Sequence, residues 1–330
     1  MAFKGVNDRL LTGAVVVVSL AGLLYFGLSA ILQDDGTSGG NPFEYDIKVF
    51  EADGSEKLFY RSAAEIALPL DEPAAIAAGP GDAVYVAGGR ELIVLDRAGK
   101  MIRRLSLNGP ATALAVDRNG HAYLCIREHV EVLDSAGTGR AEWIGLGENA
   151  ILTSIALGPD GVYIADAGGL VVWRFDRRGR LLGRIGERDD RRDIPGFLIP
   201  SPYFDVAIDS DGFLWAVNTG RHQLENYTSG GELRSSWSKS SMTVTGFCGC
   251  CNPTHIAILE DGSFVTSEKG IARVKIHNRI GEFTALVAGP DQFDEGTVGL
   301  DLAVDSSGRI LVLDPKRKQL RIYIEKEEQA

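Results

Sequence analysis

A unit that repeats six times between residues 72 and 326 constrains the fold of this chain more than any other feature. Each unit has an apolar strand, a turn that ends in Gly, a second apolar strand, a polar loop and a further strand that ends at another Gly turn. The Gly residues of the first turns lie 39 to 51 residues apart, at Gly81, Gly120, Gly161, Gly212, Gly262 and Gly308. Such spacing is typical of propeller blades of about 40 to 50 residues. The Val, Ile and Leu residues between the turns favour strands over helices.

We therefore predict an all-β fold, a six-bladed β-propeller, within a domain that spans 44–330. The blades are expected near 72–108, 109–149, 150–187, 201–238, 252–288 and 298–326. The sixth blade ends after three strands, so we expect a strand from 45–61 to complete it and to fasten the ring. Radial repetition also removes the exposed sheet edges that an open array of this length would have.

The charge balance argues against nucleic-acid binding. The chain has 34 Lys and Arg residues against 45 Asp and Glu residues, and its formal net charge is −11. Phosphate backbones are bound by clustered cations, which an acidic surface does not supply. We therefore predict that nucleic acid is not a partner.

An uncharged apolar run near the N-terminus predicts a membrane anchor. The run covers residues 10–32, and its 23 residues would reach roughly 34 Å as a helix, enough to cross a hydrocarbon core of ~30 Å. Lys4 and Arg9 precede it, and Asp34 and Asp35 follow it. The positive-inside rule then leaves residues 1–9 in the cytoplasm. We predict a single-pass transmembrane helix in the inner membrane, a flexible linker at 33–43 and a propeller on the periplasmic side.

A cleaved signal peptide is the alternative for this apolar run. Signal peptides use apolar regions of about 7 to 15 residues, followed by small residues at the cleavage site. The run at 10–32 is longer, and no convincing small-x-small site follows it. The length therefore favours an uncleaved anchor.

Two segments show the repeat most clearly: VAIDSDGFLWAVNTGRHQLENYTSGG at 206–231 and LAVDSSGRILVLDPKRKQLRIY at 302–323. They resemble the NHL repeats of six-bladed β-propellers, and the resemblance covers about 72–324. That family includes sensor ectodomains, protein or RNA binders, metal-dependent lyases and lactone hydrolases. The resemblance therefore implies the fold but leaves the function to the site.

Three connections between blades are longer than the others: 185–201, 238–252 and 289–298. In a propeller these connections run from the outer strand of one blade to the inner strand of the next, and they all open on one face, here termed the top face. Because function usually lies on loops that a rigid scaffold supports, we expect the three loops to cap one sector of the top face and to carry the functional site.

The inner strands indicate the same sector. Their alignment places six residues at one equivalent position near the mouth of the central channel: Ala75, Ala113, Ser154, Asp205, His255 and Asp301. Two carboxylates and an imidazole at such a mouth could bind a divalent metal or act as acid and base. They could equally be solvated residues of a wet channel, since charge clusters mark sites only statistically.

The most specific local motif is GFCGCCNPTH at 246–255, which holds three of the four cysteines. The fourth, Cys125, belongs to the second strand of blade two and is too far around the ring to pair with them. We expect Cys125 to be a buried core residue. In an oxidising compartment Cys248 and Cys251 can form a local disulfide, which leaves Cys250 over.

Three interpretations of this motif stay open. In the first, zinc, copper or an iron–sulfur cluster is held by Cys248, Cys250, Cys251 and His255. In the second, Cys248 and Cys251 are a redox-active pair, with Cys250 as a bystander or resolving thiol. In the third, a structural disulfide only pins the loop.

The sequence thus predicts a module that is not catalytic by itself and serves as a binding or accessory subunit of a membrane redox or metal-handling system. A protein partner is expected on the top face over blades four to six. The residues expected to line this surface are Arg221, His222, Asn252, Glu268 and Lys269. One alternative is a metal-dependent lyase or hydrolase that uses Asp205, His255 and Asp301. A second alternative is a plain protein-binding scaffold with a structural disulfide.

Overall fold

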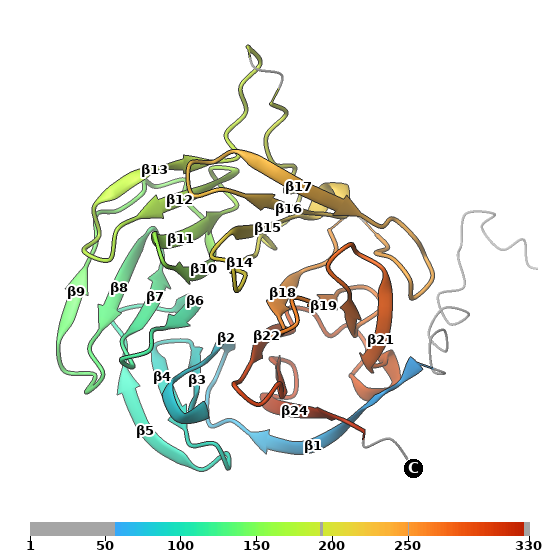
Figure 1. The fold of residues 1–330 in the computed structure, drawn as a ribbon. Coiled ribbons are helices and arrows are strands. Elements are labelled where there is room, and N and C mark those ends of the chain that lie inside the picture. Colours follow the sequence, from blue (N-terminus) through green and yellow to red (C-terminus); the bar gives the residue numbers. More distant parts are fainter. Residues whose placement is uncertain (1–56, 192–193, 250, 327–330) are drawn as a thin grey trace, which may run out of the picture. The chain divides into compact units, whose positions relative to one another are not determined.

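The computed structural model describes residues 57–191, 194–249 and 251–326, which form six four-stranded antiparallel sheets around a central axis (Figure 1). This architecture confirms the prediction of an all-β, six-bladed propeller. The predicted membrane span at 10–32 and the linker at 33–43 lie outside the described residues. In the described part of the chain, no helix is both long and apolar enough to cross a membrane.

The strands follow one another from the inside of each blade to the outside. Blade one contains β2 (Pro73–Ala78), β3 (Val84–Gly88), β4 (Glu91–Leu95) and β5 (Met101–Ser106). Blade two contains β6 (Ala111–Val116), β7 (Ala122–Ile126), β8 (His129–Leu133) and β9 (Arg140–Glu142). Blade three contains β10 (Leu152–Gly158), β11 (Gly161–Asp166), β12 (Val171–Phe175) and β13 (Leu181–Ile185).

The second half of the ring repeats this order. Blade four contains β14 (Val206–Ile208), β15 (Leu214–Asn218), β16 (Gln223–Tyr227) and β17 (Leu233–Ser238). Blade five contains β18 (His255–Ile258), β19 (Phe264–Glu268), β20 (Arg273–His277) and β21 (Phe283–Ala288). Blade six contains β22 (Asp301–Val304), β23 (Ile310–Asp314) and β24 (Gln319–Glu325).

The fourth strand of blade six comes from the other end of the chain. It is β1 (Tyr60–Ala67), which pairs antiparallel with β24, from Tyr60 opposite Glu325 to Ala67 opposite Gln319. Most of the segment 45–61, where we expected this strand, lies outside the described residues. The first and last strands of the propeller thus share one sheet, and their hydrogen bonds close the ring.

The first turns explain why an Asp precedes the turn Gly by three positions in blades two, four and six. Asp117 Oδ1 accepts hydrogen bonds from the backbone N–H groups two and four residues further on, and Asp209 and Asp305 do the same. Gly120 has φ of 82°, a left-handed conformation that favours glycine. Side-chain caps of this kind stabilise tight turns, so each inner strand passes directly to the second strand.

Alternating side chains fill the spaces between neighbouring blades, because successive residues of a strand point to opposite faces of its sheet. On β7, Leu124 and Ile126 pack towards blade one, whereas Tyr123 and Cys125 pack towards blade three. Cys125 is completely buried, which confirms its prediction as a core residue. Burial also raises the pKa of its thiol.

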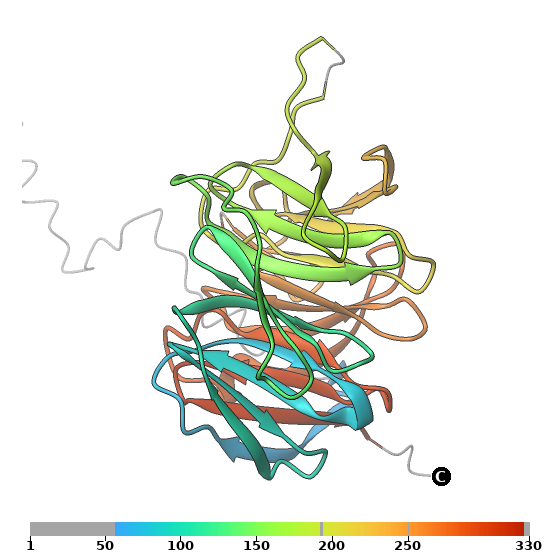
Figure 2. The same cartoon turned by 90° about the vertical axis from the view of Figure 1, so that its left-hand side faces the viewer.

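The connection 185–201 does not cap a sector of the top face as expected. It extends outward from the edge of the ring between blades three and four (Figures 1 and 2). We call residues 186–197 the arm, with 192–193 outside the described residues. At the base of the arm Phe197 is buried, and its ring centroid lies 4.7 Å from that of Phe204 and 5.9 Å from that of Tyr227. This packing between the two blades directs the arm sideways.

Candidate functional site

The cysteine motif lies in the connection 238–252 between blades four and five. Cys248 and Cys251 are both buried. Cys250 lies outside the described residues. The side chains of Cys248 and Cys251 are therefore shielded from solvent by the surrounding protein.

Side chains from both flanking blades hold this cysteine loop. His222 of blade four pairs through Nε2 with the carbonyl oxygen of Gly249 at 2.5 Å. Asn252 donates to the carbonyl oxygens of Cys248 and Lys269, at 2.7 and 2.9 Å. Asn252 also accepts the Lys269 N–H at 2.9 Å. His222 and Asn252, two of the expected contact residues, thus support the loop.

A buried ion cluster on β19 and β20 fastens the cysteine loop to blade five. Glu268 pairs with Arg273 at 2.7 Å and with Lys275, and all three side chains are fully buried. Lys275 also donates to the carbonyl oxygens of Val244 and Gly246, which belong to the loop. Burial lowers the pKa of Lys275 to about 8, although Glu268 opposes the shift.

Burial and the charges of the same cluster together shift the pKa of Cys248. Burial raises the pKa of the Cys248 thiol and Glu268 raises it further, whereas Arg273 and Lys275 act in the opposite direction. A thiol with a raised pKa is a weak nucleophile, because the thiolate is the reactive form. The environment of Cys248 is therefore more typical of a structural cysteine than of a redox-active one.

Glu268 does not line a binding surface as we expected. It is 1% exposed, and its carboxylate pairs with two buried cations, Arg273 and Lys275. Lys269 is partly exposed, with its ammonium 4.8 Å from the centroid of the Tyr203 ring. Arg221 is also partly exposed, and its guanidinium lies 3.9 Å from the Glu225 carboxylate. Of the five expected contact residues, Arg221, His222 and Lys269 are therefore partly exposed, whereas Asn252 and Glu268 are buried.

The aligned channel residues join neighbouring blades. Asp205 accepts the Ile256 N–H of blade five at 2.6 Å, and Asp301 accepts the Ile76 N–H of blade one at 2.8 Å. Ser154 Oγ accepts an N–H of blade four at 3.2 Å in the same way. Each inner strand is a sheet edge, and its buried N–H groups need acceptors. These side chains supply the acceptors and bind one blade to the next around the axis.

Burial dominates the electrostatics of these channel residues. It raises the pKa of Asp205 to about 6, with His255 opposing the increase and Asp301 adding to it. Burial also raises the pKa of Asp301 to about 7, against the lowering effect of two backbone hydrogen bonds. The pKa of His255 is lowered by burial, and its Nδ1 is buried without a hydrogen-bond partner. Asp205 thus interacts electrostatically with both other members of the set.

In the described part of the chain, neither set of residues that we predicted to bind a metal brings its ligand atoms close together. There, the ligand atoms of Cys248, Cys251 and His255 do not gather within 4.8 Å of one another. Neither do the ligand atoms of the channel set, whose carboxylates accept backbone hydrogen bonds instead. A metal or cluster at the cysteine loop would depend on Cys250, which lies outside the described residues, and it stays a hypothesis.

Solved structures with the same architecture include two lyases. A streptogramin B lyase matches with a TM-score of 0.54 and 12% identity, over 81% of this chain and 98% of that one. A catalytically inactive virginiamycin B lyase from Staphylococcus aureus with quinupristin has the same TM-score and identity, over 81% and 100%. A protein of unknown function from Bacteroides thetaiotaomicron matches with a TM-score of 0.57 and 16% identity, over 83% and 74%.

No family model matches this chain, and no curated protein does. At identities of 12 to 16% the similarity shows a shared propeller fold and does not transfer an activity. The similarity to NHL repeats therefore stays a resemblance, and the function has to be argued from the side chains of this chain.

Two hollows flank the arm, and neither was predicted from the sequence. The first has a volume of about 850 Å³ and is lined by Leu170 and Leu198, which are 41% and 50% exposed. The second has a volume of about 740 Å³ and runs along blade four. Arg188 and Arg221 line both. The one sequence signal for this region was the length of the 185–201 connection.

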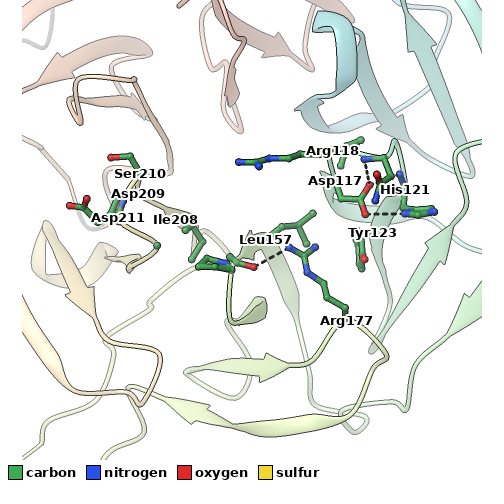
Figure 3. A pocket seen from close by; sticks show the side chains of 15 residues that line it. Asp117, Arg118, His121, Tyr123, Leu157, Arg177, Ile208, Asp209, Ser210 and Asp211 are labelled. Carbon is green, nitrogen blue, oxygen red and sulfur yellow. Dashed lines mark hydrogen bonds and ion pairs between the residues drawn. The ribbon is translucent and has the colours of Figure 1, made fainter.

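A third hollow, of about 940 Å³, lies among the first turns of blades two, three and four (Figure 3). First turns and inter-blade connections lie at opposite ends of the inner strands, so this hollow belongs to the bottom face. Arg118 extends into it, while Arg177 donates to the Gly158 carbonyl oxygen at 3.0 Å and Asp117 pairs with His121 at 2.9 Å. The sequence marked these segments as turns but could not show that the three turns meet.

Proposed function

We propose that this chain is a non-catalytic binding module, held on the periplasmic side of the inner membrane by a span at 10–32, and that it serves a membrane redox or metal-handling system as an accessory subunit. Its propeller is the scaffold. A protein partner contacts the surface around the arm, on the top and outer side of blades three and four. The observation that carries this proposal is the exposed apolar pair Leu170 and Leu198 beside the arm.

The surface around the arm has the composition of a protein interface. Leu170 and Leu198 are large apolar side chains that remain exposed, and Arg184, Arg188 and Arg221 line the same hollow. Protein interfaces combine an apolar centre with a polar rim and are enriched in Arg. An apolar centre with an arginine rim is therefore in place beside the arm.

Leu198 is held in position by blade four. Its N–H donates to Asn218 Oδ1 at 2.9 Å, and its carbonyl oxygen accepts the Gly220 N–H at 2.8 Å. Asn218 is buried and donates in turn to Glu225 at 2.9 Å. An anchor that is already ordered loses little conformational entropy when a partner binds. This support favours Leu198 as the centre of the contact.

The channel favours a binding module over a metal-dependent lyase, which is the second candidate. A metal that activates water needs ligand oxygens that are free to bind it. Asp205 and Asp301 each accept one N–H from the next blade and one from the residue that follows them. Their oxygens are therefore engaged in holding the ring together.

Photocrosslinking in intact membranes tests the proposed contact. A photoreactive amino acid at position 198 of the full chain is expected to crosslink to one defined protein, whereas the same amino acid at position 280 is not. Ile280 is the matched control because it is 68% exposed and lies in the turn between β20 and β21, away from the arm. Leu170→Glu is expected to weaken the crosslink from position 198 about tenfold or more, since the partner would have to bury a charge.

Equal crosslinking from positions 198 and 280 would refute the contact, as would a crosslink from position 198 that survives Leu170→Glu unchanged. The anchor has a separate test. After an alkaline wash, the full chain is expected to stay in the membrane pellet, and its release would contradict the membrane span without affecting the contact at the arm.

A further inference from the structure

We propose that blade two holds a zinc site formed by His129, Glu131 and Glu142. These residues belong to β8 and β9, the two outer strands of the blade. Their ligand atoms all lie within 4.8 Å of one another. Among the described residues this is the one group of His, Cys, Asp and Glu side chains that meets this condition. The site is separate from the cysteine loop, the channel and the arm, and it does not depend on the proposed function.

The pairing of the two strands brings the three side chains to one face of the sheet. His129 and Glu131 are two residues apart on β8, so they point to the same side. Glu142 on β9 is the register partner of Glu131. Like charges directly opposite each other on neighbouring strands are destabilising. A cation between the two carboxylates would replace this repulsion with attraction.

The distances fit a metal ion with little movement. His129 Nε2 lies 3.6 Å from Glu131 Oε1 and 3.9 Å from Glu142 Oε1. Nitrogen and oxygen ligands at about 2.0–2.2 Å from a tetrahedral zinc ion lie roughly 3.4 Å from one another. The Glu142 side chain is 64% exposed and can adjust to complete the site.

The burial of Glu131 is the independent observation that points to a missing ligand. Glu131 is completely buried, and neither its carboxylate oxygens nor His129 Nε2 has a hydrogen-bond partner. Arg140 Nη1 lies 3.3 Å from Glu131 Oε2 and offsets one charge. Glu131 Oε1 faces His129 instead. Because a buried polar atom without a partner is costly, and because two carboxylates outnumber one guanidinium, a divalent cation suits the site.

The donor set selects the kind of metal. Imidazole nitrogen suits zinc and other late transition metals, whereas calcium and magnesium prefer oxygen ligands alone. No thiolate belongs to the group, so a site for Cu(I) is not favoured. Three protein ligands leave the fourth zinc position for water, as in open zinc sites. The exposed side of Glu142 gives the ion access from solvent.

Zinc binding by the full chain, purified in a mild detergent and stripped with a chelator, tests the site. After dialysis against micromolar free zinc, the unchanged chain is expected to retain one zinc ion per chain. Glu131→Gln and Glu142→Gln are each expected to weaken zinc binding at least about tenfold, which is a loss of about 1.4 kcal/mol or more in binding free energy. Glu148→Gln, at an exposed carboxylate between blades two and three, is the matched control and is expected to bind as the unchanged chain does.

Cobalt as a spectroscopic substitute separates this site from the cysteine loop. A site of one imidazole and two carboxylates is expected to give cobalt ligand-field bands without a thiolate charge-transfer band, and Glu142→Gln is expected to abolish them. Because Glu142 is exposed, its variant tests the site even if Glu131→Gln fails to fold. Zinc binding that both glutamine variants leave undiminished would overturn the proposal. So would a cobalt spectrum that shows thiolate ligands alone, or the absence of zinc binding by the unchanged chain.

Discussion

Glu268→Gln is expected to lower the free energy of unfolding by about 3–5 kcal/mol. The change leaves Arg273 and Lys275 fully buried without the carboxylate that they share. Removing one partner of a buried ion pair is costly because the remaining charge stays in a medium that solvates it poorly. Urea unfolding followed by Trp fluorescence measures the change.

The same substitution is expected to loosen the cysteine loop, because Lys275 holds that loop through the carbonyl oxygens of Val244 and Gly246. Alkylation of Cys248 under native conditions should accelerate on the order of tenfold as local opening becomes easier. Glu260→Gln, at an exposed carboxylate of the same blade, is the matched control and should change stability by less than about 0.5 kcal/mol. If Glu268→Gln behaves like this control, the buried cluster is not what holds the loop.

Asp301→Asn is expected to gain stability relative to the unchanged chain as the pH rises from about 4.5 to 8, by on the order of 2–4 kcal/mol. Burial raises the pKa of Asp301 to about 7. The folded chain therefore keeps a proton that the unfolded chain releases above about pH 4. The free energy of unfolding of the unchanged chain falls through this range for that reason and levels off above about pH 7, whereas Asn does not titrate.

Urea unfolding of both chains at several pH values measures this difference. Both chains retain Asp205, whose pKa is raised in part by Asp301, so the variant also loses that part of the shift, which acts in the same direction. Asp211→Asn, in an exposed turn of blade four, controls for the loss of a carboxylate as such. A stability difference between Asp301→Asn and the unchanged chain that does not vary with pH would show that the backbone hydrogen bonds of Asp301 outweigh its burial. In that case the carboxylate would be ionised throughout the range.

In this propeller the two carboxylates near the axis, Asp205 and Asp301, each accept a backbone hydrogen bond from the next blade. Asp301 joins blade six to blade one, where the ring also closes through β1 and β24. The surfaces that we propose as binding sites lie elsewhere, at the arm and on the outer strands of blade two. A rigid ring of this kind can carry independent sites on separate blades.

Local spacing in the sequence was sufficient to predict the architecture. The Gly at the end of each first turn, the Asp three residues before it in blades two, four and six, and the apolar strands on either side act through contacts within a few residues. Such signals can be interpreted without knowing the tertiary structure. The buried position of Cys125 followed from the same pattern, because the middle strands of a blade are covered on both faces.

The roles of the site residues depended on partners far away in the chain. The alignment placed Asp205 and Asp301 at equivalent positions, but only the folded ring brings each carboxylate to an N–H of the next blade. Glu268 looked like a surface loop residue until its strand pairing placed it opposite Arg273. The proposed zinc ligands likewise meet through the register of β8 and β9. The sequence alone determined the repeat, because turn and strand preferences are local. The tertiary structure decided which polar groups form hydrogen bonds and ion pairs, because burial and partners arise only when the blades pack together.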